Sequence, residues 1–454
     1  MCYVLCNMSR LNIDKNPATR FREHEFTRIS SNEWYSPGEN DQSRTLVRDE
    51  FIAGTSDDPA IEYSRIHGID YVAIEQEYFQ VLEAARDAAD DVLYESVARK
   101  LAELFRHKEV RRRLGGEAID KALSMRRAES MNEEIFGEVE QQDFDAVFSR
   151  VLEKAEVLAD TLPEARELLD LSGEKVELSR EAFDFELHKE TLDRLREDLF
   201  DIIPGLEGSL APHEDRDVDA TEAAEWGQKI LEVTGITSVG WRAAVVAGKV
   251  ASTNKHTKRL NYGNERVFES TAQMNGTNCH EAIGHALLSH NADLQEDPRL
   301  RVSKPITLDI EEGGATVIEQ IMSGQPRQVG QRYLLALGLG KGLDQHAEPR
   351  SFRQTYDILY RSIVVEQATG GKEIDVLSAQ RKAYQECMRT RRGGALDARD
   401  ISYFNGAKKV NPWFNQIARL PAEKRKESLK IYLSGRFDPT DSEQAALLGL
   451  ETAA

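Results

Sequence analysis

Residues 278–285 read NCHEAIGH, and they place two imidazoles and one carboxylate within about a turn and a half of a predicted helix. The common metallopeptidase pattern is H-E-x-x-H, in which two histidines four residues apart bind zinc and the glutamate beside the first activates a water. Here His280 and His285 are five residues apart, and Glu281 follows the first. The stretch therefore predicts half of a zinc site, built on H-E-x-x-x-H.

The longer spacing creates a geometric problem for a regular helix. At about 100° per residue, a step of five residues carries the second histidine about 140° around the helix axis. A π-bulge would return both rings to roughly one face, and such bulges occur mostly at functional sites. Gly284 should lower the free-energy cost of this backbone distortion, because glycine has no side chain. A chance H-E-x-x-x-H on an ordinary amphipathic helix is the alternative, so a third ligand decides between the two readings.

Residues 311–319, EEGGATVIE, are the candidate source of that ligand. Glu312 and Glu319 are seven residues apart and share one face of a helix, while the small residues between them allow another backbone to approach closely. We predict that Glu312 is the third ligand and that the fourth position stays open for water. Glu319 would then orient a ligating imidazole, with a surface ion pair as the alternative.

These motifs resemble a family of zinc carboxypeptidases that includes the microtubule-associated tyrosine carboxypeptidases and the bacterial QEGLA-motif proteins. The family's H-E-[IV]-G-T-H is similar to residues 280–285, and its Q-E-G-L-A is similar to residues 311–315. Its R-V-x-R-G, followed by Asp, Tyr and Gly, resembles residues 389–393 followed by Asp400, Tyr403 and Gly406. The resemblance covers roughly residues 240–406, and its departures affect positions beside the predicted ligands.

The resemblance implies a zinc carboxypeptidase that removes C-terminal tyrosine-type or glutamate-type residues from peptides or proteins. Zn²⁺ would be held by His280, His285 and Glu312, and Glu281 would act as the general base. The resemblance also implies that Tyr403 donates a hydrogen bond to the developing oxyanion. Arg389 would bind the terminal carboxylate of the substrate. Four other basic side chains are alternatives for that last role: Lys258, Arg259, Arg391 and Arg392.

Two other functions fit parts of the pattern. An aminopeptidase similar to dipeptidyl peptidase III also uses H-E-x-x-x-H with a downstream glutamate helix, although that chain is longer. A catalytically idle helical binding protein that keeps zinc for structure is the second alternative. Glu281 argues against the idle protein, because a structural zinc site does not need a general base beside it.

Composition limits the remaining possibilities. A chain of 454 residues with 40% hydrophobic residues suits two or three domains with a sizeable core. A formal net charge of -20 argues against nucleic acid or an anionic membrane as a partner. Residues 1–6 are apolar but too short for a signal or a membrane span, and Met8 is an alternative start. The four cysteines have no paired spacing, which favours the cytoplasm. The oligomeric state is left open.

The pattern along the chain predicts a mainly α fold with a small β-sheet, an α+β zincin-like architecture. We expect an irregular N-terminal arm over residues 1–65, a helical domain over residues 66–210, and a catalytic domain with closing C-terminal helices over residues 211–454. Strands are predicted at residues 240–246 and 259–268, in a sheet that covers the metal-binding helix and could bind a substrate by strand addition. The basic run at residues 106–113 is expected to be a solvated helix end.

Overall fold

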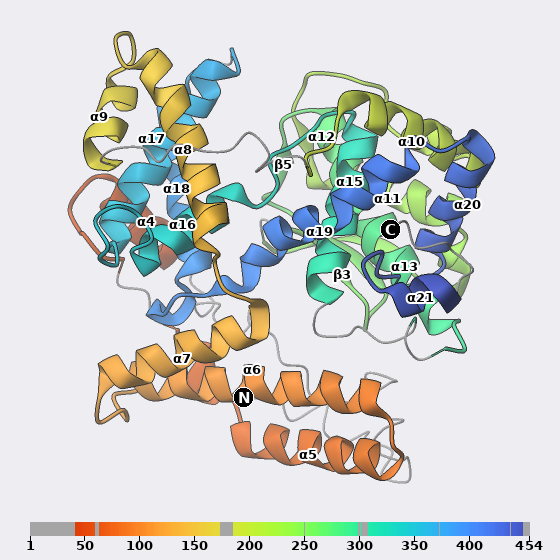
Figure 1. The fold of residues 1–454 in the computed structure, drawn as a ribbon, viewed down its shortest axis with the longest axis horizontal. Coiled ribbons are helices and arrows are strands. Elements are labelled where there is room, and N and C mark those ends of the chain that lie inside the picture. Colours follow the sequence, from red (N-terminus) through yellow and green to blue (C-terminus); the bar gives the residue numbers. More distant parts are fainter. Residues whose placement is uncertain are drawn as a thin grey trace. The chain divides into compact units, whose positions relative to one another are not determined.

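The computed structural model describes residues 41–59, 63–172, 185–248, 250–297, 300, 307–371, 373–435 and 437–447. By its contacts the chain forms two compact units. Unit 1 comprises Met1–Ala182 and Gly330–Ile401, and unit 2 comprises Phe183–Val329 and Ser402–Ala454. This division differs from the predicted contiguous domains, because residues 330–401 group with the N-terminal helices (Figure 1).

Unit 1 is helical in its described part. Its first element, α4 (Asp41–Ile52), lies within the predicted irregular arm, so that prediction is wrong for these residues. Residues 1–40 and 60–62 of the arm lie outside the described residues. The other α-helices of the unit are α5 (Tyr71–Asp87), α6 (Asp91–Leu114), α7 (Lys121–Phe136), α8 (Gln141–Leu158), α9 (Pro163–Ser172), α16 (Gln331–Lys341), α17 (Phe352–Thr369) and α18 (Val376–Thr390).

The interior of unit 1 contains one apolar face of α6 and corrects one prediction. The apolar residues of α6 at helical spacing are buried: Leu93, Val97, Leu101 and Leu104. Arg106, on the same helix, was expected in solvent, yet its side chain is 1% exposed and lies 2.8 Å from Asp397 in an ion pair. A buried carboxylate supplied by a distant part of the chain outweighs the local charge pattern, because a buried charge must be paired.

Unit 2 contains two small sheets. In the larger, the strand order is β2-β4-β3: β2 (Arg242–Val246) pairs parallel with β4 (Arg259–Gly263), and β3 (Ala251–Asn254) pairs antiparallel with β4. β1 (Val218–Asp219) and β5 (Val267–Phe268) form the other. Both predicted strand regions are confirmed, whereas β3 was not predicted.

Unit 2 also contains α-helices. The principal ones are α10 (Lys189–Ile202), α11 (Ala220–Val233), α12 (Thr271–Cys279), α13 (Leu288–Asp293), α15 (Thr307–Ser323), α19 (Ser402–Ile417), α20 (Ala422–Leu433) and α21 (Ser442–Leu447). Asp219 caps α11, accepting hydrogen bonds from the backbone N–H groups of Thr221 and Glu222. In the described part of the chain, no helix combines the length and the apolar character that crossing a bilayer requires.

Small residues bring the central helices of unit 2 together. α15 packs against α12 on one side and α19 on another (Figure 1). A Cβ on Gly313 would lie 2.5 Å from the carbonyl carbon of Gly406, so α15 and α19 touch backbone to backbone. A Cβ on Gly284 would lie 2.7 Å from the Cα of Ala315. These close approaches carry the glutamate helix up to the histidine helix.

Candidate metal centre

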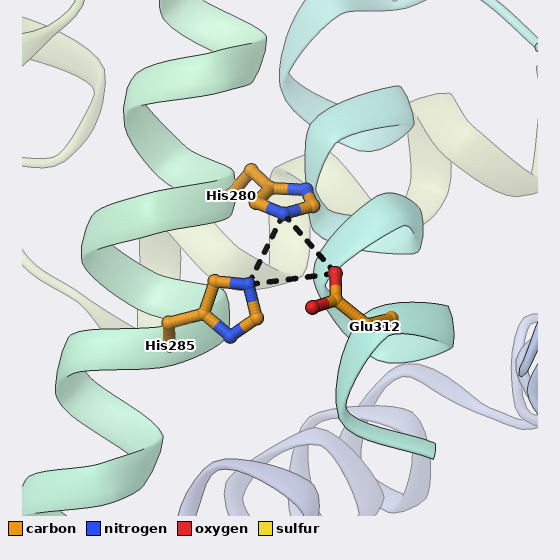
Figure 2. A group of neighbouring side chains, drawn as sticks. All are labelled: His280, His285 and Glu312. Atoms are coloured by element: carbon orange, nitrogen blue, oxygen red, sulfur yellow. Dashed lines mark hydrogen bonds and ion pairs between the residues drawn. The ribbon is translucent and has the colours of Figure 1, made fainter. Parts of the chain in front are cut away.

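The histidine helix contains the predicted distortion. After α12 the chain continues as a π-helix, η6 (His280–Leu287), which then returns to α-helix in α13. The wider turn absorbs the extra residue of H-E-x-x-x-H, so both rings point to the same side (Figure 2). The π-bulge is confirmed. Gly284 has an additional role, because its missing Cβ makes room for Ala315 of α15.

Three side-chain donor atoms converge beside this π-helix, from His280, His285 and Glu312. The two Nε2 atoms are 3.1 Å apart, and Glu312 Oε2 lies 3.8 Å from His280 Nε2 and 3.7 Å from His285 Nε2 (Figure 2). A tetrahedral zinc with bonds of about 2.0–2.2 Å places its ligand atoms about 3.3–3.5 Å apart. The observed separations bracket this value, so the group could hold a metal ion.

The burial and the hydrogen bonding of these donor atoms also fit a bound cation. Both histidines are buried, with 9% and 8% of their surface exposed. Within the described residues, Glu312 Oε2 is buried without a hydrogen-bond donor. Three lone-pair donors facing one another at low exposure repel each other unless a proton or a metal lies between them. The donor set of two imidazoles and one carboxylate is that of hydrolytic zinc sites.

A carboxylate and a cation support the first imidazole. Glu319 Oε2 lies 3.4 Å from His280 Nδ1, and Arg327 forms an ion pair with the same carboxylate. Burial opposes protonation of His280, but its contact with Glu319 and the charges of the nearby glutamates outweigh this and raise the pKa of His280 to about 9. Glu319 thus contacts the imidazole of His280 and also forms the ion pair that was its alternative, whereas its orienting role stays a prediction.

The second imidazole has a matching arrangement. His285 Nδ1 lies 2.9 Å from Glu311 Oε1 and must carry the proton of this hydrogen bond, because a carboxylate only accepts. The same Oε1 atom forms an ion pair with Lys255. With Nδ1 protonated, the Nε2 lone pair of His285 is available to a metal.

Glu281, the predicted general base, is held by strand β3. Its side chain is buried, and Thr253 Oγ1 lies 2.7 Å from its Oε2 atom and 2.9 Å from its backbone oxygen. Glu281 is outside the converging donor group, although its charge contributes to the raised pKa of neighbouring His280. The predicted sheet thus does reach the metal helix, through a strand that the sequence did not reveal.

The two remaining predicted site residues lie in different units. Tyr403 is half-buried in α19 of unit 2, one turn before Gly406, which packs on Gly313. Arg389 belongs to unit 1, where its Nε and Nη2 atoms donate to Asp400 at 2.9 and 2.7 Å. Its Nη1 atom donates to Tyr333 at 2.6 Å. The predicted roles of Tyr403 and Arg389 stay predictions.

Sequence reasoning missed several partners of the site. Nothing in the local sequence distinguishes Thr253 or Lys255, because β3 is short and its four residues are all half-buried. Glu311 was not predicted as a partner of His285. Cys279, beside His280, is fully buried in the apolar core of unit 2 and is not one of the converging donors.

The chain was also compared with known proteins. None of the protein-family models, the curated proteins or the solved structures gave a match.

Proposed function

We propose that the chain is a zinc-dependent metallopeptidase that removes C-terminal residues from peptides or proteins. One observation carries the proposal: three donors converge from His280, His285 and Glu312, while the carboxylate of Glu281 is held beside them by Thr253. A structural zinc site is closed by four protein ligands and does not need this extra carboxylate. Three ligands and a separate base are the parts of a hydrolytic site.

The chain's own residues then divide the chemistry. When bound, zinc supplies the Lewis acidity that lowers the pKa of a water to about 7 and polarises a peptide carbonyl. Glu281 accepts the proton of that water and later returns it to the leaving amine. Thr253 holds Glu281 Oε2, so the transferred proton falls to Oε1. The hydrogen bond from Thr253 would also keep the base beside the metal, so that Glu281 does not become a fourth ligand.

The sheet supports a peptide as the substrate. β3 is an edge strand of the β2-β4-β3 sheet, and within the described residues no strand pairs with its other side. Extended peptides bind to such edges through backbone hydrogen bonds. Because β3 also carries Thr253, a peptide added to this edge would lie next to the base. Tyr403 is proposed as the oxyanion donor, supported by the packing of α19 on α15.

Cleavage from the C-terminus rests on the resemblance of residues 240–406 to the carboxypeptidase family. Arg389 is proposed to bind the terminal carboxylate. Its guanidinium already donates to Asp400 and Tyr333, so a substrate carboxylate would either join these partners or replace one of them.

Zinc content and turnover of Glu281→Gln test the base and the metal site together. The wild type should bind one zinc per chain, and Glu281→Gln should bind zinc equally while losing nearly all peptide cleavage, because an amide cannot accept the proton. Glu225→Gln, at an exposed position of α11, is the matched control and should keep wild-type activity. Wild-type cleavage by Glu281→Gln would refute its role as base.

The direction of cleavage is tested with paired peptides. A free-acid peptide should lose single C-terminal residues, and its C-terminally amidated twin should be cleaved far more slowly, because the amide offers no carboxylate. Arg389→Ala should abolish most of this difference. Release of dipeptides from the N-terminus would instead assign the enzyme to the aminopeptidase class, and zinc binding without any cleavage would favour the idle binding protein.

A further inference from the structure

Glu311 joins the metal centre to Lys255, in the turn that follows strand β3. Its Oε1 atom accepts the hydrogen bond from His285 Nδ1 at 2.9 Å and forms an ion pair with the ammonium of Lys255. The three side chains are 17%, 10% and 22% exposed for Glu311, His285 and Lys255, so the pair is largely shielded from solvent. We propose that Glu311 and Lys255 are positioning residues, which fix the ring orientation and tautomer of His285 for metal binding.

The shared oxygen atom explains why two residues are needed. Glu311 directly precedes the ligand Glu312, and a carboxylate at this position could turn toward the metal in place of its neighbour. Two donors on one oxygen, the imidazole N–H and the ammonium, hold the carboxylate away from the converging ligand atoms. Lys255 also offsets the negative charge of Glu311, which would otherwise add to that of Glu312 in a buried site.

One short stretch of the chain contacts both carboxylates that flank the site. Thr253 of β3 hydrogen-bonds to Glu281, and Lys255, in the turn that follows β3, forms the ion pair with Glu311. The end of β3 and its turn therefore contact the proposed base through one side chain and, by way of Glu311, the proposed ligand His285 through the other.

Both imidazoles have a carboxylate with a cationic partner beside Nδ1, which argues against an accidental surface ion pair. On His280 the corresponding residues are Glu319, 3.4 Å from Nδ1, and its ion-pair partner Arg327. Each imidazole thus faces the converging donors with Nε2 and a cation-paired carboxylate with Nδ1. Such outer partners of zinc-binding histidines orient the ring, and their loss typically weakens metal binding about 10- to 100-fold.

The inference rests on the proposed zinc site, and zinc affinity and a cobalt spectrum test it without any substrate. Zinc dissociation constants are measured by competition with a chelator for the wild type, Lys255→Met, Glu311→Ala, Glu311→Gln and the Lys255→Met/Glu311→Ala double variant. Glu311→Ala should weaken zinc binding about 10- to 100-fold and alter the visible spectrum of bound Co²⁺. Glu311→Gln should restore much of the affinity, because its amide oxygen can still accept the hydrogen bond from His285.

Lys255 should act through Glu311, which the double variant examines. Lys255→Met should weaken zinc binding, and the double variant should be no weaker than Glu311→Ala alone. Lys409→Met is the matched control. Lys409, in α19, lies 2.7 Å from Asp309, which is in α15 like Glu311, and its substitution should leave zinc binding unchanged.

The outcomes separate this inference from the proposed function. A wild-type protein that does not bind zinc would refute the proposed function. Zinc binding by the wild type, together with unchanged affinity and Co²⁺ spectrum in Glu311→Ala, would overturn the positioning role alone. Equal loss in Glu311→Gln and Glu311→Ala would also overturn it, because a hydrogen-bond acceptor would then not be what His285 needs.

Discussion

Metal binding should compete with a proton on His280. The pKa of this imidazole is raised to about 9, chiefly because Glu319 and the neighbouring carboxylates overcome the opposing effect of burial. Below pH 9 the metal-free protein therefore carries a proton on the ring that must leave before Nε2 can bind a metal. At pH 7 only about one molecule in 100 has lost it, which weakens apparent affinity about 100-fold, or about 2.7 kcal/mol.

Titration calorimetry measures this competition. Zinc is titrated into the metal-free protein in buffers of different ionisation enthalpy, which gives the number of protons released per metal. The zinc dissociation constant should fall about ninefold from pH 7 to pH 8 through this proton. Glu319→Gln removes the contact that raises the pKa, so this variant should release fewer protons than the wild type at the same pH. Equal proton release by the two proteins, or an affinity independent of pH, would refute the reasoning.

Three further predictions concern packing, catalysis and metal removal. Gly313→Ala should destabilise the protein by about 1–3 kcal/mol despite the better helix propensity of alanine, because its Cβ meets the backbone of Gly406; Gly208→Ala, at an open position, is the control in thermal unfolding. Thr253→Val should lower kcat by about one order of magnitude with zinc affinity unchanged, because Glu281 loses a hydrogen bond of about 1.5 kcal/mol; unchanged kcat would remove Thr253 from the site. A chelator should lower the Tm of the zinc-loaded wild type but not the Tm of His285→Ala. With zinc at 100 times its Kd, the loss of stability in the wild type should be about 2.7 kcal/mol. A similar fall in both proteins would contradict metal binding at this site.

The sequence was informative where the chemistry depends on local spacing. The π-helix follows from the five-residue step between two histidines that must face one point, and the choice of Glu312 follows from a carboxylate among small residues.

The sequence was uninformative where a contact joins distant segments. Lys255 meets Glu311, and Arg106 meets Asp397, through pairings whose partners are set by packing and not by sequence spacing. Two residues of the stretch 311–315 have long-range contacts of the same kind. Glu311 brings a charge that Lys255 offsets, and a Cβ on Gly314 would overlap the hydroxyl of Tyr432. Neither partner could be identified before the fold was known.

The order of segments in unit 2 has a consequence for how the protein matures during synthesis. All three donor residues have left the ribosome once α15 has emerged, but α19, on which α15 rests through Gly313 and Gly406, emerges only after residues 330–401. A nascent chain therefore carries the complete ligand set for some time before α19 is available to pack against α15, the helix that carries Glu312. Correct metal loading is then expected late in biosynthesis, and a chain released before α19 would bind zinc weakly although no ligand is missing.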